Sequence, residues 1–201
     1  MNVSRRSFLK SLIVLPTGAA VLAACGSSGM GGMGGMGTGT ATPGMGSMGS
    51  GPYDQNFIDM MVAHHQAAID MAKVAQRKGE HAELKRLAAD IVSAQDGEIA
   101  QMKAWRKQWY GSDQIATSTA GGMSGMGGMN VDLGQLENAQ PFDKAFIDNM
   151  IPHHESAIQM AKDARTKAQH QEIKDLAGQI IAAQQQEIDQ MKAWRTQWFP
   201  G

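Results

Sequence analysis

The fold is decided by the stretch Phe57-Ile58-Asp59-Met60-Met61-Val62-Ala63-His64-His65, which returns 89 positions later as Phe146-Ile147-Asp148-Asn149-Met150-Ile151-Pro152-His153-His154. The match extends without a gap over residues 54–110 and 143–199, where 32 of the 57 aligned positions are identical. An internal repeat of this kind defines the structural unit of a chain. We therefore expect both halves to fold in the same way.

Each repeat has the pattern of two helices. The first stripe of the first repeat alternates spacings of four and three residues, which is typical of one face of a helix. It contains Phe57, Met61, His64, Ala68 and Met71. The second stripe has the same spacing and contains Leu84, Ala88, Ile91, Gln95, Glu98, Met102, Trp105 and Trp109. The second repeat reproduces both stripes, so each repeat predicts a helical hairpin.

The hairpins have recognisable boundaries. Asp54 is the expected N-cap of the first helix, and Gly79 marks the break between the helices. The second repeat has Ala168 in place of Gly79, which weakens the turn signal there. One hairpin cannot bury its apolar stripe alone, so we predict an all-α four-helix bundle from residues 53–110 and 142–200. Two separately packed hairpin domains are the alternative.

Two low-complexity segments flank the first repeat. Residues 25–52 form a Gly- and Met-rich tether, and residues 111–141 form a Gly- and Met-rich linker. Segments of this composition lack the side chains for a core, so both are predicted to be disordered. Their thioethers would collect soft ions such as Cu(I) or Ag(I), unless the methionines are compositional drift. They are Met30, Met33, Met36, Met45, Met48, Met123, Met126 and Met129.

The N-terminus has the features of an export signal. Arg5-Arg6 precede an apolar run, and residues 1–24 resemble a twin-arginine signal peptide. The run ends in Leu22-Ala23-Ala24-Cys25, which resembles a lipobox. We therefore predict an exported lipoprotein, anchored in a membrane through lipidated Cys25 and facing the periplasm or the cell exterior. A plain signal peptide or an uncleaved anchor is the alternative.

Composition and charge exclude several classes of protein. Without residues 1–24 the chain has 15 basic and 19 acidic side chains, a net charge of −4, whereas nucleic-acid binding needs a basic face. The single cysteine excludes an intrachain disulfide. The sequence contains no Gly-rich phosphate loop after a strand and no nucleophile–base set, so it predicts a protein that is not an enzyme.

The hairpin turn brings polar residues of two helices to one level. In an antiparallel pair that turns near residue 80, position i lies opposite roughly 160 − i. His64 then lies level with Gln95 and Glu98, and Met61 lies near Glu98 and Met102. Adjacent helical residues point about 100° apart. One histidine of each pair should therefore face its own hairpin, and the other the opposite hairpin or the bundle rim.

Imidazole, thioether and carboxylate groups at one level indicate a metal site. A buried glutamate must be paired or bind a metal. Met and His without thiolate favour Cu(I) or Ag(I), and Cu(II) is tolerated through imidazole and carboxylate. The leading candidate ligands are His64, His65, Met61, His153, His154 and Met150. The secondary candidates are Glu98, Glu187, Met71, Met160, Met102 and Met191.

Three further features bear on this site. Pro152 replaces Ala63 just before the second histidine pair and frees the carbonyl of Asp148, so a kink there would re-aim that pair. His81 and His170 lie near the turns and are expected to be solvated. Tryptophans one turn apart are expected to close the bundle end; they are Trp105, Trp109, Trp194 and Trp198.

Two other functions share parts of this pattern. A ferritin-like di-iron oxidase needs two Glu-x-x-His motifs, whereas both repeats have Met-x-x-His; a copper oxidase belongs to the same alternative. A structural or partner-binding bundle would bind no metal. The sequence leaves open which metal binds and how many ions bind. It leaves open whether the repeats form one shared site or two, and whether the protein stores copper or delivers it to a copper-transfer partner. It also leaves open the membrane and the oligomeric state.

The repeats resemble the DUF305 family (domain of unknown function 305). Its hallmark is similar to F-x-x-x-M-I-P-H-H-x-x-A-I-x-M-A followed by Q-x-x-E-I-x-x-M-x-x-W. The second repeat has this pattern from Phe146 to Trp194, and the first has it except that Val62-Ala63 stands for Ile-Pro. The resemblance implies a ferritin-like bundle, and some members are implicated in periplasmic copper binding and resistance through Met and His. We therefore expect an exported protein that sequesters or buffers copper, with silver possible.

Overall fold

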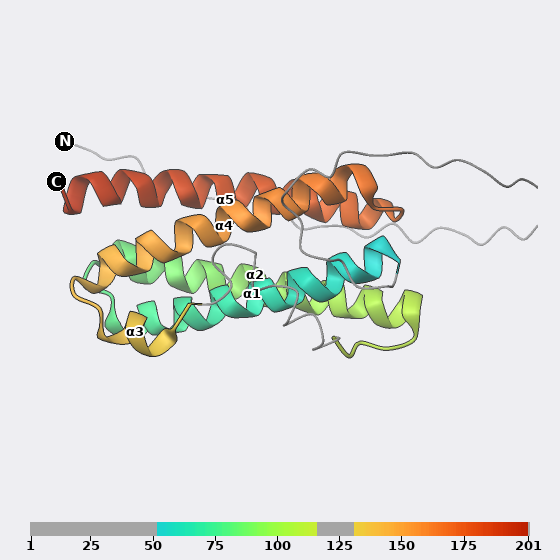
Figure 1. The fold of residues 1–201 in the computed structure, drawn as a ribbon, viewed down its shortest axis with the longest axis horizontal. Helices are drawn as coiled ribbons and strands as arrows, with labels where there is room; N and C mark the ends of the chain where they lie inside the picture. Colours follow the sequence, from blue (N-terminus) through green and yellow to red (C-terminus); the bar gives the residue numbers. More distant parts are fainter. Residues whose placement is uncertain (1–51, 116–130, 201) are drawn as a thin grey trace, which may run out of the picture. The chain divides into compact units, whose positions relative to one another are not determined.

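The computed structural model describes residues 52–115 and 131–200, and within these ranges the chain is helical without any strand (Figure 1). The helices are α1 (Tyr53–Lys78), α2 (Ala82–Tyr110), α3 (Leu133–Asn138), α4 (Phe142–Lys167) and α5 (Gln171–Trp198). The prediction of an all-α fold is confirmed. The predicted signal peptide, Cys25 and the methionines of the low-complexity segments lie outside the described residues.

The two hairpin turns share one backbone conformation, although one contains glycine and the other alanine. Gly79 follows α1 with φ −53° and ψ 141°, and Ala168 follows α4 with φ −63° and ψ 146°. Their N–H groups donate to the carbonyls of Ala75 at 2.9 Å and Ala164 at 3.0 Å. Neither position uses the left-handed region that favours glycine, and the second repeat makes the same turn with alanine, although a Cβ at Gly79 would lie 2.7 Å from the carbonyl oxygen of Ala75.

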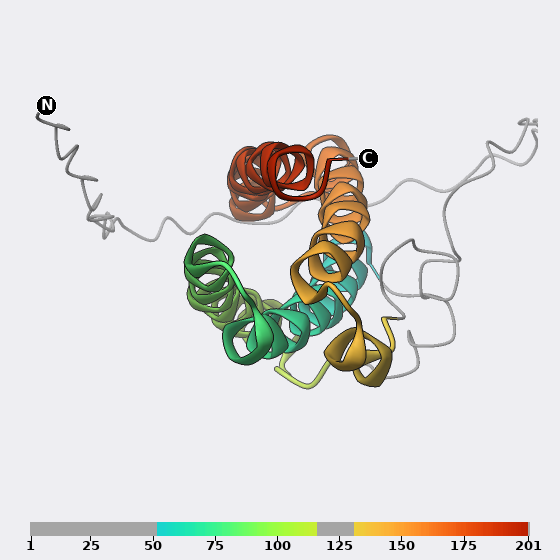
Figure 2. The ribbon, with the colours of Figure 1, turned by 90° about the vertical axis from the view of Figure 1, so that its left-hand side faces the viewer.

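The hairpins pack against each other through their first helices. α1 packs on α2, α4 packs on α5, and α1 meets α4. Figure 2 shows the helices nearly end-on, in the order α2, α1, α4, α5. The polar histidine pairs lie on α1 and α4, so this central contact is where the candidate site forms.

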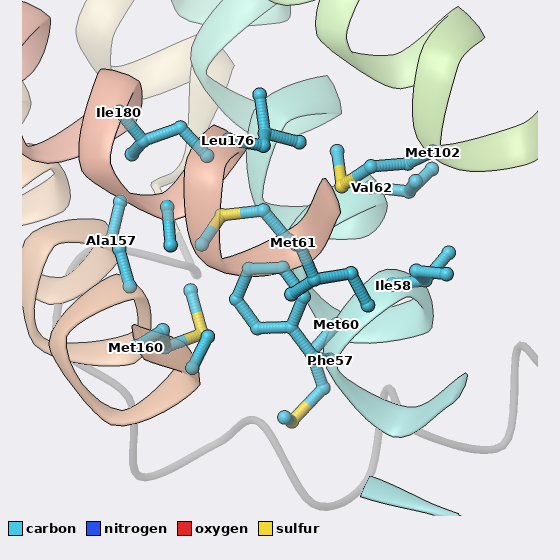
Figure 3. Close-up of a cluster of buried hydrophobic side chains, with 14 of the residues drawn as sticks. Phe57, Ile58, Met60, Met61, Val62, Met102, Ala157, Met160, Leu176 and Ile180 are labelled. Atoms are coloured by element: carbon cyan, nitrogen blue, oxygen red, sulfur yellow. The ribbon is translucent and has the colours of Figure 1, made fainter. Parts of the chain in front are cut away.

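Two apolar clusters hold the helices together, and each contains residues of both hairpins. One joins Met61 and Met102 with Ala157 and Ile180 (Figure 3). Burying one large aliphatic side chain stabilises the fold by roughly 1.5–3 kcal/mol. Because the hairpins share both clusters, the alternative of two separately packed hairpin domains is wrong.

Two local predictions need correction. Asp54 is not the N-cap of α1, because Pro52 precedes the helix and the Asp54 carboxylate bonds to the opposite hairpin. The linker is not wholly without structure, because residues 131–141 contain α3. Asp132 caps α3 by accepting the N–H of Gln135 at 3.0 Å, and Leu136 is buried against the second apolar cluster.

Within the described residues, no helix is both long enough and apolar enough to span a membrane.

Candidate metal centre

Four buried imidazoles lie at the contact between α1 and α4. His64, His65 and His154 are 0% exposed, and His153 is 1% exposed. The rings of His64 and His153, which we call the inner pair, have centroids 3.8 Å apart and are tilted by 45°. His65 and His154, which we call the outer histidines, lie beside the inner histidine of their own helix, with ring centroids 6.5 Å and 6.3 Å from it. The inner pair therefore takes one imidazole from each hairpin.

The inner pair has no internal hydrogen bonds. Both ring nitrogens of His64 and both of His153 are buried, and none makes a hydrogen bond of ordinary geometry within residues 52–115 and 131–200. Against the larger effect of burial, a backbone contact from His153 raises the pKa of His64. A buried polar group without a partner costs about 1–3 kcal/mol. Buried polar groups are nearly always satisfied, so four unsatisfied nitrogens in contacting rings indicate a position for a ligand.

The outer histidines are bound by glutamates of their own hairpins. His65 Nε2 lies 2.6 Å from Glu98 Oε2, and His154 Nε2 lies 2.6 Å from Glu187 Oε2. The predicted divergence of the histidine pair is confirmed, because His65 faces α2 of its own hairpin while His64 faces the opposite hairpin. His64 was predicted to lie at the level of Glu98, but it is the adjacent His65 that bonds to Glu98.

The two outer histidine–glutamate pairs have equal distances. Pro152 is accommodated inside a continuous α4, and His154 meets its glutamate at the same 2.6 Å as His65. Pro152 therefore does not change how the outer histidine of the second repeat meets its glutamate. The glutamate side chains are 20% and 19% exposed, so each carboxylate lies between solvent and a buried imidazole.

The candidate methionine ligands are all buried, and they divide between the two apolar clusters. Met61 and Met102 share one cluster with Met160 of the other hairpin (Figure 3). The second cluster has the reciprocal set, namely Met71, Met150 and Met191. Each set thus contains two methionines of one hairpin and one of the other, as expected for two repeats related by an approximate twofold axis.

Burial keeps the inner histidines neutral. It lowers the pKa of His64 well below its ordinary value, and the neighbouring His153, His65 and His154 add to this effect. Burial likewise lowers the pKa of His153 to about 3, with His154 and His65 contributing. A neutral imidazole keeps a nitrogen lone pair, which is the form that binds metal ions.

Two glutamines of the second helices also have buried polar atoms. The Oε1 atoms of Gln95 and Gln184 are buried and have no hydrogen-bond partner within the described residues. Gln95 was predicted to lie at the level of His64, but it was not among the candidate ligands. The fact that Gln95 is a polar residue in a largely apolar helix stripe could have identified it as a candidate. Within the described ranges, no three His, Cys, Asp or Glu side chains converge closely enough to hold an ion by themselves.

The turn histidines are not simply solvated. His170 stacks on Trp109 with centroids 3.7 Å apart, and His81 stacks on Trp198 at 3.8 Å. Each tryptophan also stacks on the one a turn before it, at 5.5 Å in α2 and 4.9 Å in α5. The sequence pattern does not predict this arrangement, because each histidine–tryptophan stack joins residues of different hairpins.

The chain belongs to the DUF305 family. Residues 54–195 match the family described as "Domain of unknown function (DUF305)". This range includes both histidine pairs, both glutamates and every candidate methionine ligand. The resemblance inferred from the histidine motif is thereby confirmed.

Solved structures with this fold include metal-bound forms of one protein. CopM in the Cu(II)-bound form is 45% identical, with a TM-score of 0.67 over 73% of this chain and 97% of that chain. CopM in an Ag-bound form, obtained by co-crystallization, is 43% identical, with a TM-score of 0.63 over 74% and 98%. A putative secreted DUF305 protein from Streptomyces coelicolor is 26% identical, with a TM-score of 0.62 over 70% and 90%.

A short similarity also exists to a viral protein. The chain is 43% identical over 51 residues to "Uncharacterized protein L153" of Acanthamoeba polyphaga mimivirus. The match spans 25% of this chain and about a third (34%) of the length of that relative.

Proposed function

We propose that this protein binds copper or silver and sequesters or buffers the ion outside the cytoplasm. The observation that carries the proposal is the inner pair, in which four buried ring nitrogens lack hydrogen-bond partners among the described residues. CopM, 42–45% identical to this chain, has been crystallised in Cu(I)-, Cu(II)- and Ag-bound forms. Export is supported by the Streptomyces relative, which is described as a putative secreted protein.

One Cu(I) or Ag(I) ion would be shared between the hairpins by His64 and His153. Metal–imidazole bonds are about 2.0–2.1 Å long, so an ion between two ring nitrogens holds them about 4 Å apart. The inner rings are in contact, with centroids 3.8 Å apart. Because their nitrogens lie at the ring edges, both rings must turn and move apart before one ion can bind a nitrogen of each. Met61 and Met150 lie three residues before the inner histidines, on the same helix face, and would add soft thioether ligands.

The outer pairs would serve Cu(II). His65 with Glu98, and His154 with Glu187, offer an imidazole and a carboxylate at 2.6 Å separation, which is a ligand set that Cu(II) accepts. The other candidate thioethers lie in the adjoining apolar clusters and would complete coordination after side-chain rotation; they are Met71, Met160, Met102 and Met191.

The proposal does not include catalysis. A di-iron oxidase needs a Glu-x-x-His motif from each hairpin, and here the matching positions are Met61-x-x-His64 and Met150-x-x-His153. Anchoring through Cys25 and transfer of copper to a partner protein remain predictions.

The proposal is tested by equilibrium dialysis of the protein without residues 1–24 against Cu(I), Ag(I), Cu(II), Zn(II) and Fe(II). We expect Cu(I) and Ag(I) to bind most tightly. The variant M61L/M150L should weaken Ag(I) binding, whereas M60L, which alters a buried methionine that is not a candidate ligand, should not. Binding no tighter than that of free imidazole would end the metal-binding proposal.

A further inference from the structure

The hairpins are joined at their ends by two contacts that we call the clasps. In the first clasp, the Asp54 carboxylate at the start of α1 reaches the turn of the opposite hairpin. It accepts the N–H of Gln169 at 2.9 Å, the N–H of His170 at 2.8 Å and a bond from His170 Nδ1 at 2.6 Å. Trp109 covers the other side of this imidazole.

The second clasp repeats the first with the hairpins exchanged. The Asp143 carboxylate at the start of α4 accepts the N–H of Glu80 at 2.8 Å and the N–H of His81 at 2.8 Å. It also bonds to His81 Nδ1 at 2.7 Å, and Trp198 stacks on that imidazole. Asp54 and Asp143 are 2% and 0% exposed.

Each clasp supplies the helix cap that the turn itself lacks. His81 and His170 stand at the N-caps of α2 and α5 but make no side-chain cap bond. A carboxylate of the other hairpin instead accepts the N–H of the N-cap residue and of the residue before it, and its charge lies at the positive end of the helix dipole. Burial opposes the charge of Asp54, but hydrogen bonds from His170 and Gln169 lower its pKa below the ordinary value, so the carboxylate is ionised and its bonds are strong.

The clasps are equally distant from the inner pair. His64 follows Asp54 by ten residues, and His153 follows Asp143 by ten residues, which corresponds to about 15 Å along each helix. A slip of α1 by one residue would move His64 by about 1.5 Å and turn it by about 100°. A metal site tolerates errors of only about 0.5 Å and 10–20° in its ligands.

We propose that Asp54 and Asp143 are positioning residues for the ion shared by His64 and His153. By binding the turn of the opposite hairpin, each aspartate fixes the register of α1 on α4, and two clasps together prevent both sliding and rotation. This inference rests on the proposed metal-binding function. The clasp residues do not touch the ion and act only through the placement of the two imidazoles.

The structure offers a matched control in Asp59. This carboxylate is also buried, at 4% exposure, and it binds the Arg106 guanidinium, with Nη2 3.1 Å from Oδ2. Both residues belong to the first hairpin, so the pair stabilises that hairpin but does not link it to the second. Loss of Asp59 should therefore lower stability without changing the register of α1 on α4.

The first test compares D54N/D143N with D59N in Ag(I) titrations and in X-ray absorption of the Cu(I) form. We expect D54N/D143N to bind Ag(I) at least about tenfold more weakly, because the two imidazoles are no longer held in the placement that one ion requires. Its Cu(I) spectrum should lose one of the two imidazole ligands. D59N should keep both imidazoles, even though it unfolds at a lower temperature.

A second test needs no metal. Spin labels on the exposed positions Gln101 of α2 and Gln190 of α5, in a C25S background, report the distance between the hairpins. The distance distribution should broaden in D54N/D143N and stay narrow in D59N. The variant H81N/H170N, which keeps the backbone bonds to both aspartates, should lie between them and provides the test if D54N/D143N does not fold.

The outcomes separate this inference from the proposed function. If the parent binds neither Ag(I) nor Cu(I), the metal-binding function fails, and with it the role of the clasps in positioning an ion. If the parent binds Cu(I) through two imidazoles, and the clasp variants keep those imidazoles, their affinity and the narrow distance distribution, the clasps are not positioning residues.

Discussion

At the scale of single residues, the inner histidines weaken the metal-free fold. His64 and His153 bring four buried nitrogens without partners into the centre of the molecule, and such groups cost about 1–3 kcal/mol each. A fold selected for stability alone would place leucine at both positions. An ion bound by these nitrogens would offset this cost, because a ligand that binds only the folded state raises the free energy of unfolding.

The same residues predict an acid-sensitive metal-free protein. Burial lowers the pKa of His153 from 6.5 to about 3, and His64 is shifted in the same direction. At a pH between the ordinary pKa of 6.5 and the lowered pKa of the folded state, the histidine is protonated in the unfolded chain but not in the folded protein. The free energy of unfolding therefore falls as pH falls. Well below pH 6.5 the slope approaches about 1.4 kcal/mol per pH unit for each histidine, and it is smaller near pH 7.

Urea unfolding of the metal-free protein between pH 7 and pH 5 measures this slope. The variant H64L/H153L should be more stable than the parent at pH 7 and should have a flatter pH profile, because it lacks both titrating groups. Equal slopes in parent and variant would contradict the assignment of buried neutral imidazoles.

At the scale of helices, periodicity was sufficient to predict what depends on one hairpin alone. The four-three stripes predicted the helices, and the turn position predicted that a histidine of α1 meets Glu98 of α2. The clasps could not be predicted this way. Asp54 and Gln169 are 115 positions apart, and Asp54 at a helix start has an equally good local explanation as an N-cap. Only the packing of α1 on α4 distinguishes these roles.

Pro152 gives a prediction at this scale. It lies inside α4 without disturbing the bond between His154 and Glu187, and the first repeat has Ala63 at the same position. The variant P152A should therefore raise stability, by up to about 3 kcal/mol, and leave Ag(I) affinity unchanged. The reciprocal variant A63P should lower stability by a similar amount. Thermal unfolding and Ag(I) titration check both, and weaker Ag(I) binding by P152A would show that the proline aims its histidines.

At the scale of the whole molecule, the two repeats contact each other at three places along the helices: the two clasps and the inner pair. A clasp stands at each end, and the inner pair lies between them, so every level needs both hairpins. A single repeat would have half of the inner pair, an unsatisfied turn and an aspartate without its partner. Duplication of the hairpin thus creates a position between the repeats that neither repeat contains alone.

The same organisation predicts that the bundle, and not the Met-rich segments, binds the ion tightly. Ligands held by packing need no ordering, whereas a tract without a core loses chain entropy on binding. Replacing His64, His65, His153 and His154 with alanine should abolish tight Cu(I) binding and the rise in melting temperature that binding to the folded state produces. That rise corresponds to about 2.7 kcal/mol at a free ion concentration of 100 times Kd.

Deleting residues 26–50 should remove only weakly bound equivalents of Cu(I) and leave the rise in melting temperature intact. Calorimetry of both variants with Cu(I) decides between the two locations: a histidine variant that kept its tight site, with a deletion that lost it, would assign metal capture to the methionine tract.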